Sequence, residues 1–169
     1  VDLWATWCHA CLSMQNYVFK DKALDPLQAK AVFVANDTEK DSNAAVVSLL
    51  KPTAWPTFVI VDPKDDEVLA RLIGGATAAA FTGFVDEGIA ALSAKRANKR
   101  LPATEADAAL SRGDHEGAVT RYRELLKSET LSPLARARAA SSFTYALSRL
   151  QKTGECRDTA LSEADKAQG

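Results

Sequence analysis

The chain is poor in cysteine and has no long hydrophobic run. Three cysteines among 169 residues are too few for a scaffold held together by disulfides, so their number leaves the compartment open. No apolar run approaches the roughly 18 residues of a membrane-spanning helix. A formal net charge of −1 argues against nucleic acid or an anionic membrane as the main partner. With 47% hydrophobic and 25% charged residues, the composition predicts a folded protein of one or two domains.

The chain also lacks an initiating methionine and a signal-peptide pattern. It opens at Val1, directly on a predicted strand. We therefore expect that the sequence is trimmed upstream and that any targeting segment belongs to the missing part.

Charge is distributed unevenly between the two halves. Residues 1–94 carry 7 Lys/Arg against 12 Asp/Glu, a net charge of −5, whereas residues 95–169 carry 14 against 10, a net charge of +4. Between them, residues 95–102 form a basic segment that ends in a helix breaker, Pro102. The change in charge predicts two modules, residues 1–94 and 103–169, joined by a basic linker.

Residues 1–94 alternate between strand-like and helix-like segments. Short apolar runs predict strands over residues 1–5, 31–35, 57–61 and 67–73. Helices are expected over residues 12–19, from a cap at Ser42 to the break at Pro52, and from a cap at Thr77 onward. The order β-α-β-α-β-β-α predicts an α/β fold.

Residues 103–169 contain only helix-like segments, separated by two turns. One turn is predicted over residues 113–118 and the other over residues 153–156, roughly 40 residues apart. Two helix-turn-helix units at this spacing predict a short α-solenoid. Cys156 stands alone in this part, either as a buried thiol that fills space or as the site of a regulatory or intermolecular disulfide.

A pair of cysteines follows the first predicted strand, in the stretch Trp7-Cys8-His9-Ala10-Cys11. Such a pair can cycle between dithiol and disulfide. At a helix amino terminus the unpaired N–H groups and the macrodipole favour an anion, so we expect the pKa of Cys8 to lie below that of an ordinary cysteine. Cys11 lies one turn further along, on the same face of the helix.

Other kinds of site also use paired cysteines. A structural disulfide or half of a zinc site are the alternatives, but two ligands are too few for zinc, and neither His115 nor Cys156 stands at ligand spacing. A c-type haem site needs a histidine directly after the second cysteine, where this chain has Leu12. A redox pair is therefore favoured, and we expect no metal and no organic cofactor.

A cysteine pair beside a β-α-β pattern is typical of thioredoxin-like proteins. Residues 1–11 resemble the active-site segment of thioredoxins, with Asp2 six positions before Cys8 and an aromatic residue directly before the first cysteine. Trp55-Pro56-Thr57, just before an apolar strand, resembles the cis-proline loop of that family. The resemblance implies a thioredoxin-like fold over residues 1–94, a central mixed sheet flanked by helices, without the family's first strand and helix.

Within that superfamily, the chain resembles the carboxy-terminal domains of the DsbD family of bacterial thiol:disulfide interchange proteins. The likeness rests on Trp7-Cys8-x-Ala10-Cys11 and on the following Tyr17-Val18-Phe19-Lys20-Asp21. It implies exchange with protein thiols or disulfides and with a redox partner protein. It also favours a periplasmic or secreted location, while a cytoplasmic one stays open. The family topology places strand 31–35 at a sheet edge, beside strand 1–5, followed by 57–61 and 67–73.

Four residues of the site receive candidate chemical roles. The resemblance implies that Cys8 attacks a substrate disulfide and that Cys11 resolves the mixed disulfide. It also implies that Asp2 lies buried beneath Cys11 and takes its proton; the alternative is an edge position open to water. His9 either is an exposed, neutral residue or, as an imidazolium, stabilises the Cys8 thiolate and makes the couple more oxidising.

Five further residues are candidates for tuning the site or binding substrate. Trp7 shields the cysteine pair, and Ala10 completes the motif. The resemblance implies that Pro56 is cis and packs against the disulfide, while the backbone of Trp55 pairs with an extended substrate chain. Without that resemblance, Pro56 is an ordinary trans proline that begins a strand together with Thr57.

The helical module resembles tetratricopeptide repeats, with Gly113, Ala118 and Tyr122 at the expected spacings. Its second unit matches less well. Such repeats usually bind peptides or proteins, so a peptide or protein partner is one interpretation, and a packing appendage is the other.

The sequence predicts a thiol-disulfide oxidoreductase that reduces or exchanges disulfides of protein substrates through a Cys-His-Ala-Cys site. The direction of electron flow stays open, because it depends on the reduction potential and on the partner. The alternative is a binding module, in which the helical repeats recruit a partner and the thioredoxin-like part is a scaffold without essential redox turnover.

Overall fold

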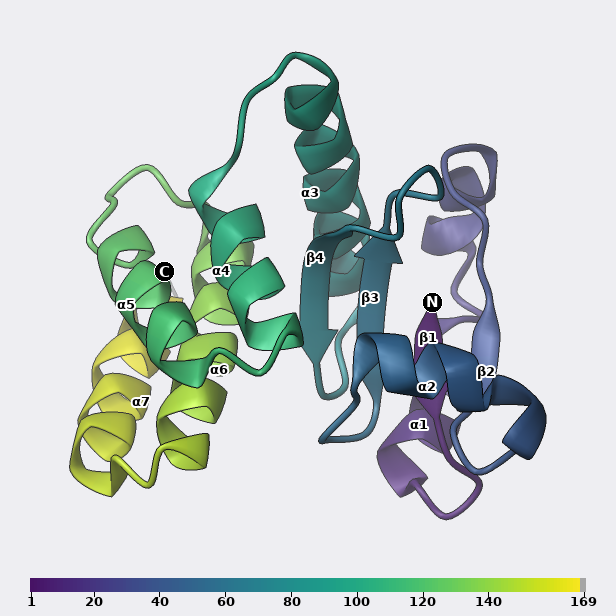
Figure 1. Ribbon diagram of the computed structural model, residues 1–169, viewed down its shortest axis with the longest axis horizontal. Helices are drawn as coiled ribbons and strands as arrows, with labels where there is room; N and C mark the ends of the chain where they lie inside the picture. The colour runs from purple at the N-terminus through teal and green to yellow at the C-terminus, as the bar shows by residue number, and fades with distance from the viewer. Residues whose placement is uncertain (168–169) are drawn as a thin grey trace.

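A four-stranded mixed sheet forms the centre of the first half of the chain (Figure 1). The computed structural model describes residues 1–167. The strands are β1 (Asp2–Trp4), β2 (Ala35–Asp37), β3 (Thr57–Val61) and β4 (Val68–Ile73), in the order β2-β1-β3-β4. β1 is parallel to β2 and antiparallel to β3, and β3 is antiparallel to β4. This is the order of neighbours that the sequence predicts.

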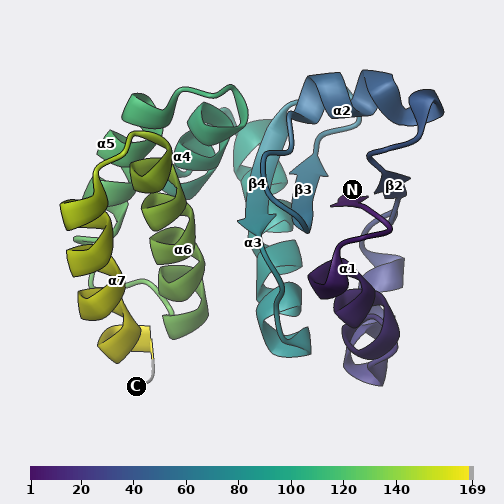
Figure 2. The same cartoon turned by 90° about the horizontal axis from the view of Figure 1, so that it is seen from below.

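Helices cover both faces of this sheet (Figure 2). Helix α2 (Ala44–Leu50) packs through Leu50 on the face that carries Leu3 and Val59. Helices α1 (His9–Ser13) and α3 (Ala78–Arg96) lie on the opposite face, with a π-helical turn at Met14–Val18 and a 3-10 helix at Lys22–Ala29. The larger core lies on that second face and contains Met14, Leu24, Leu27, Phe58, Ala70, Leu72, Phe81, Phe84 and Val85.

The predicted strand over residues 31–35 is wrong in its position. Pairing with β1 begins only where Asp2 faces Ala35, and the strand then continues through Asn36 and Asp37, beyond the predicted end at residue 35. The apolar residues before it are outside the strand, and Val32 and Phe33 are 88% and 50% exposed. Apolar residues with strand propensity form a strand only where a neighbouring strand gives them a pleated surface to pack on. Among the described residues, β2 pairs only with β1, and this pairing starts at Ala35.

Two helix starts also differ from the sequence prediction. The first helix begins at His9 rather than Leu12, and it turns π-helical at Met14. Ser42 does not cap α2, because a short 3-10 helix over Asp41–Asn43 precedes it and Asn43 is its N-cap residue. The expected cap at Thr77 is confirmed, since its side chain accepts the Ala80 N–H at 3.2 Å.

Four helices follow the sheet domain: α4 (Pro102–Ser111), α5 (His115–Leu125), α6 (Pro133–Arg149) and α7 (Thr153–Ala167). The first predicted turn, over residues 113–118, is right only at its start, where Gly113 has φ 81° and Asp114 accepts the Gly117 N–H at 2.8 Å, because α5 already begins at His115. The second turn was placed too late, because α7 already begins at Thr153 and the turn lies around Gln151, at φ 57°. The two turns themselves are alike, because the residue after each positive-φ position donates its N–H to a carbonyl oxygen five residues earlier at 3.0 Å, Asp114 to Ala109 and Lys152 to Leu147.

The helical region packs along the free edge of the sheet, beside β4 (Figure 1). There the backbone N–H of Arg71 donates to Asp107 of α4 at 3.0 Å, and its carbonyl oxygen accepts from Arg138 of α6 at 2.9 Å. Side chains thus satisfy the hydrogen bonds that a further strand would otherwise make.

The basic segment after the sheet domain is partly helical, and two of its basic residues, Lys95 and Arg100, form ion pairs. Helix α3 continues to Arg96, so residues 97–101 connect it to α4. Lys95 contacts Asp62 at 2.7 Å and Asp65 at 2.6 Å, both in the turn between β3 and β4. The opposite charges of the two halves therefore meet at this turn.

Candidate redox site

The two cysteines lie at the junction between β1 and α1, where the chain leaves the sheet. Cys8 is the N-cap residue of α1, and its Sγ accepts the backbone N–H of Cys11 at 3.0 Å. The two sulfurs form a disulfide, with the Cα atoms 5.2 Å apart. Cys8 is 5% exposed and Cys11 1% exposed, so Cys8 is the more accessible of the two.

Aromatic side chains surround the disulfide. Trp4 and Trp55 pack against the buried cluster of Ala5 and the two cysteines. Trp7 contacts Trp55 edge to face, with ring centroids 5.4 Å apart, yet it remains 54% exposed. The structure therefore brings Trp55, which is distant in sequence, to the cysteines and against Trp7. Much of the Trp7 ring remains exposed to solvent.

Two polar residues that the sequence analysis missed hold Trp7 and Trp55 in place. The indole Nε1 of Trp7 donates to Glu39 at 2.7 Å, and that of Trp55 donates to the Thr38 hydroxyl at 2.9 Å. Both partners follow β2, which runs beside β1. No local pattern in the sequence connects them to the cysteines, because only the parallel pairing of β1 with β2 places them there.

The loop before β3 brings Trp55 and its neighbours to the site. The Trp55–Pro56 peptide bond is cis, the isomer that the resemblance implies. Pro56 is buried, and its carbonyl oxygen accepts the Gly74 N–H at 2.8 Å. Thr57 is also buried, and its hydroxyl donates to the carbonyl oxygen of Ala54 at 2.7 Å.

Asp2 lies on the sheet face that carries α1. It stands opposite Phe58 of the larger core and shares its strand face with Trp4, which packs against the cysteines. Burial raises the pKa of the Asp2 carboxyl to about 6. Its buried Oδ1 has no hydrogen-bond partner among the described residues. Asp2 is thus half-buried on an inner strand rather than at an open edge, and its position beneath Cys11 stays a prediction.

His9 and Ala10 form the first turn of α1 and are exposed. Leu12, in the same helix, is 36% exposed, and Tyr17 in the following turn is 76% exposed. Trp7, Leu12 and Tyr17 are therefore exposed apolar or aromatic side chains on the segment that carries the cysteines, and we call them the apolar rim. A rim of this kind suits contact with a protein surface.

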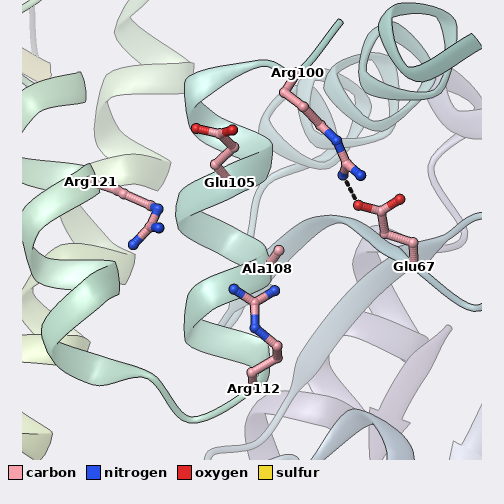
Figure 3. A pocket seen from close by; sticks show the side chains of 6 residues that line it. All are labelled: Glu67, Arg100, Glu105, Ala108, Arg112 and Arg121. Atoms are coloured by element: carbon pink, nitrogen blue, oxygen red, sulfur yellow. Dashed lines mark ion pairs between the residues drawn. The ribbon is translucent and has the colours of Figure 1, made fainter. Parts of the chain in front are cut away.

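A charged pocket lies away from the cysteines, between α4, α5 and the turn before β4 (Figure 3). It is lined by Glu67, Arg100, Glu105, Ala108, Arg112 and Arg121. Arg100 and Glu67 form an ion pair there, so part of its charge is neutralised internally. None of these residues belongs to the cysteine site.

Cys156 is half-buried against the core of the helical region, and its Sγ lies 3.5 Å from the Thr144 carbonyl oxygen. This environment fits the interpretation of a thiol that fills space. Among the side chains that the structure describes, no group of three or more from His, Cys, Asp or Glu is arranged to hold a metal ion. Within residues 1–167, no helix combines the length and the apolar character needed to cross a membrane.

The chain is similar over about half its length to DsbD proteins. It is 31% identical over 84 residues to the thiol:disulfide interchange protein DsbD of Yersinia enterocolitica serotype O:8 / biotype 1B, a match that covers 48% of this chain and 14% of that protein. It is 32% identical over 89 residues to DsbD of Yersinia pestis strain Pestoides F, covering 51% of this chain and 13% of that protein. The chain therefore spans only a small part of the length of these relatives.

No protein-family model matches the chain, and no solved structure matches it significantly. The partial homology to DsbD supports a thioredoxin-like relationship. The mixed sheet flanked by helices is compatible with that fold. Together, the homology and the disulfide between Cys8 and Cys11 point to thiol-disulfide exchange.

Proposed function

We propose that this protein is a thiol-disulfide oxidoreductase that reduces or exchanges disulfides of protein substrates. The position of Cys8 at the start of α1 carries the proposal, because its Sγ accepts the Cys11 N–H at 3.0 Å. In the dithiol form, this donor and the helix macrodipole stabilise a thiolate at Cys8. Since Cys8 is also the more exposed cysteine, it is the nucleophile.

The reaction consists of two successive exchanges. The Cys8 thiolate attacks one sulfur of the substrate disulfide, which forms a mixed disulfide and releases the first substrate thiolate. The Cys11 thiolate then attacks Cys8 Sγ, which closes the Cys8–Cys11 disulfide and releases the second substrate thiolate. The substrate gains two electrons and the protein loses two, so a redox partner protein must return them. The opposite direction uses the same steps in reverse.

Asp2 acts as the proton acceptor for the resolving thiol. Cys11 is 1% exposed, so water cannot readily take the proton that this thiol must lose before it attacks. A carboxyl with a pKa of about 6 on the same side of the sheet is ionised at neutral pH and can accept it. In this proposal Asp2 therefore accelerates resolution and leaves the first attack unchanged.

The substrate chain binds between the apolar rim and the loop at residues 51–56. Trp7 and Leu12 supply exposed apolar surface on the segment that carries the cysteines. Trp55 packs against the cysteines and contacts Trp7, and its backbone pairs with an extended substrate segment. A partly unfolded protein with an accessible disulfide suits this surface best.

Insulin reduction tests the proposal, with dithiothreitol as electron source. The wild type should precipitate the insulin B chain faster than Cys8→Ser, which should give only the background rate. In a separate reaction without dithiothreitol, reduced Cys11→Ser should accumulate a mixed disulfide with insulin, which added dithiothreitol then cleaves. Cys156→Ser is the matched control, because it removes the cysteine of α7 and should leave turnover unchanged.

Background-level turnover by the wild type would overturn the proposal. It would favour the alternative, in which the sheet domain is a scaffold and the helical region binds a partner. If Cys156→Ser lost turnover while Cys8→Ser stayed active, the chemistry would take place at Cys156 and not at Cys8.

A further inference from the structure

We propose that the helical region holds the substrate-binding loop in place, with Tyr145 of α6 as a positioning residue. The loop spans residues 51–56 and connects α2 to β3. The hydroxyl of Thr53, in the middle of this loop, makes a hydrogen bond to the hydroxyl of Tyr145. This inference rests on the proposed function, because it assigns to the helices a task at the same site.

The loop is also anchored where it leaves α2. Arg71 of β4 donates through Nη1 to the carbonyl oxygen of Leu50 at 3.0 Å and through Nη2 to that of Lys51 at 3.4 Å. These carbonyls lie at the carboxyl end of α2, where carbonyl oxygens have no hydrogen-bond donor within the helix. The Arg71 side chain is among the largest that are fully buried, so this anchor is shielded from water.

The helical region completes this anchor. The same Nη1 of Arg71 also contacts the Ser111 hydroxyl of α4 at 3.3 Å. Asp107, one turn earlier on α4, accepts the backbone N–H of Arg71 at 3.0 Å and is fully buried. The position of the loop's first residues therefore depends on α4 as well as on β4.

One face of α6 carries both contacts to the sheet domain. Arg138 and Tyr145 lie about two helical turns apart, so they project from the same side of the helix. Arg138 is fixed by the Arg71 carbonyl at 2.9 Å and by Glu87 of α3 at 2.9 Å. Because Arg138 sets the position of α6 relative to β4, the Tyr145 hydroxyl is held at a defined point over the loop.

The far end of the loop meets the redox site. Trp55 is fixed there by its hydrogen bond to Thr38 at 2.9 Å and by its contact with Trp7. Thr53 lies between this end and the anchor at Arg71. Without the Tyr145 contact, the middle of the loop loses its bond to the helical region, and a substrate chain that pairs with Trp55 must order more of the loop when it binds.

The test separates substrate binding from sulfur chemistry. Tyr145→Phe and Thr53→Val each delete one hydroxyl and should raise the KM for insulin about fivefold, as expected for one hydrogen bond, with little change in kcat. The reaction of reduced protein with a small aromatic disulfide and the reduction potential should stay the same. The double variant should match the single ones, because both remove the same contact.

Two variants serve as controls. Thr53→Ser keeps the hydroxyl, so its KM should be that of the wild type. Thr120→Val makes the same kind of change on the exposed side of α5, where Thr120 bonds only within its own helix, and should leave KM unchanged. Unchanged KM in Tyr145→Phe and Thr53→Val, or additive effects in the double variant, would overturn the proposal.

Failure of the proposed function has a different signature. If the wild type reduces insulin no faster than Cys8→Ser, the oxidoreductase assignment fails. The loop contact is then measured by hydrogen exchange of the amides over residues 53–57. Faster exchange in Tyr145→Phe than in Thr120→Val would still support positioning by α6, and equal exchange would refute it.

Discussion

Arg138 donates through Nη1 to Oδ2 of Asp107 at 2.7 Å, and the two side chains are 6% and 0% exposed. The same Nη1 reaches the carbonyl oxygen of Arg71, and the same Oδ2 accepts the Arg71 N–H. One ion pair between α4 and α6 thus satisfies the outward-facing backbone groups in the middle of β4. The edge of the sheet is closed by side chains from the helices, which makes the helical region part of the sheet domain's structure.

Breaking this pair should destabilise the protein strongly. Arg138→Met keeps much of the side chain's length but leaves the Asp107 carboxylate buried without its cation, so we expect a loss of about 3 kcal/mol in the free energy of unfolding. Urea unfolding of the oxidised protein measures it. Arg157→Met is the matched control, because the Arg157–Asp158 pair is exposed and should contribute less than about 1 kcal/mol. Equal losses in the two variants would contradict the role of the buried pair.

The sequence predicts the parts of the fold that depend on local patterns. The position of the cysteines between a strand and a helix, the cap at Thr77 and the order of the strands all follow from short-range signals or from the resemblance. Strand edges are less predictable, because the apolar run at residues 31–35 has strand propensity throughout but finds a partner strand only from Ala35 onward.

The contacts that tie the two halves together have no local signal. Arg71 lies in a strand that otherwise looks apolar, and its partners Asp107 and Arg138 are 36 and 67 residues away in the sequence. The same is true of Trp55, which is held by Thr38. Sequence patterns identify the chemistry of the site, whereas the residues that position it come from long-range pairing.

Asp2→Asn should change how stability depends on pH. In the folded protein burial raises the pKa of Asp2 to about 6, whereas an unfolded aspartate titrates near about 3.9. The folded state therefore binds the proton more tightly, and the contribution of Asp2 to stability is greatest below pH 4 and declines as the pH rises through about 6. Asp2→Asn should lack this decline. Thermal unfolding of both proteins between pH 4 and 8 measures the difference.

The same substitution should slow resolution of the mixed disulfide. If Asp2 accepts the Cys11 proton, the wild-type rate should fall below about pH 6, where the carboxyl becomes protonated. In Asp2→Asn, resolution should be slow at every pH, and its rate should not fall below about pH 6 as the wild-type rate does. Stopped-flow measurement of resolution at several pH values tests this, and identical profiles for the two proteins would rule out the role.

His9→Ala should make the couple more reducing. His9 begins α1 next to Cys8 and is exposed, so an imidazolium there favours the thiolate by charge. Without it, we expect a higher pKa of the Cys8 thiol and a lower reduction potential, measured by thiolate absorbance and by equilibration with glutathione. His9→Lys keeps a positive charge and should stay close to the wild type. An unchanged potential in His9→Ala would refute the tuning role.

Helix α3 approaches β3 so closely at Gly88 that a methyl group fits only if the Ile60 side chain or the helix shifts. A Cβ at this position would lie 2.4 Å from Cδ1 and 2.9 Å from Cγ2 of Ile60. Gly88→Ala should therefore destabilise the protein by about 1–3 kcal/mol, although alanine favours helix. Gly83→Ala is the matched control in the same helix, because its Cβ would meet only the Leu134 side chain at 3.7 Å.

Gly88→Ala and Gly83→Ala should change the free energy of unfolding in opposite directions. Gly83→Ala should gain about 0.5–1 kcal/mol from helix propensity, since its contact is ordinary. Ile60→Ala removes the branched side chain that Gly88→Ala strikes, so the double variant Gly88→Ala/Ile60→Ala should be more stable than the sum of its single changes predicts. Urea unfolding of the four variants measures this coupling. Additive losses would mean that α3 shifts as a whole to accept the methyl group, and that Gly88 does not fix its distance from the sheet.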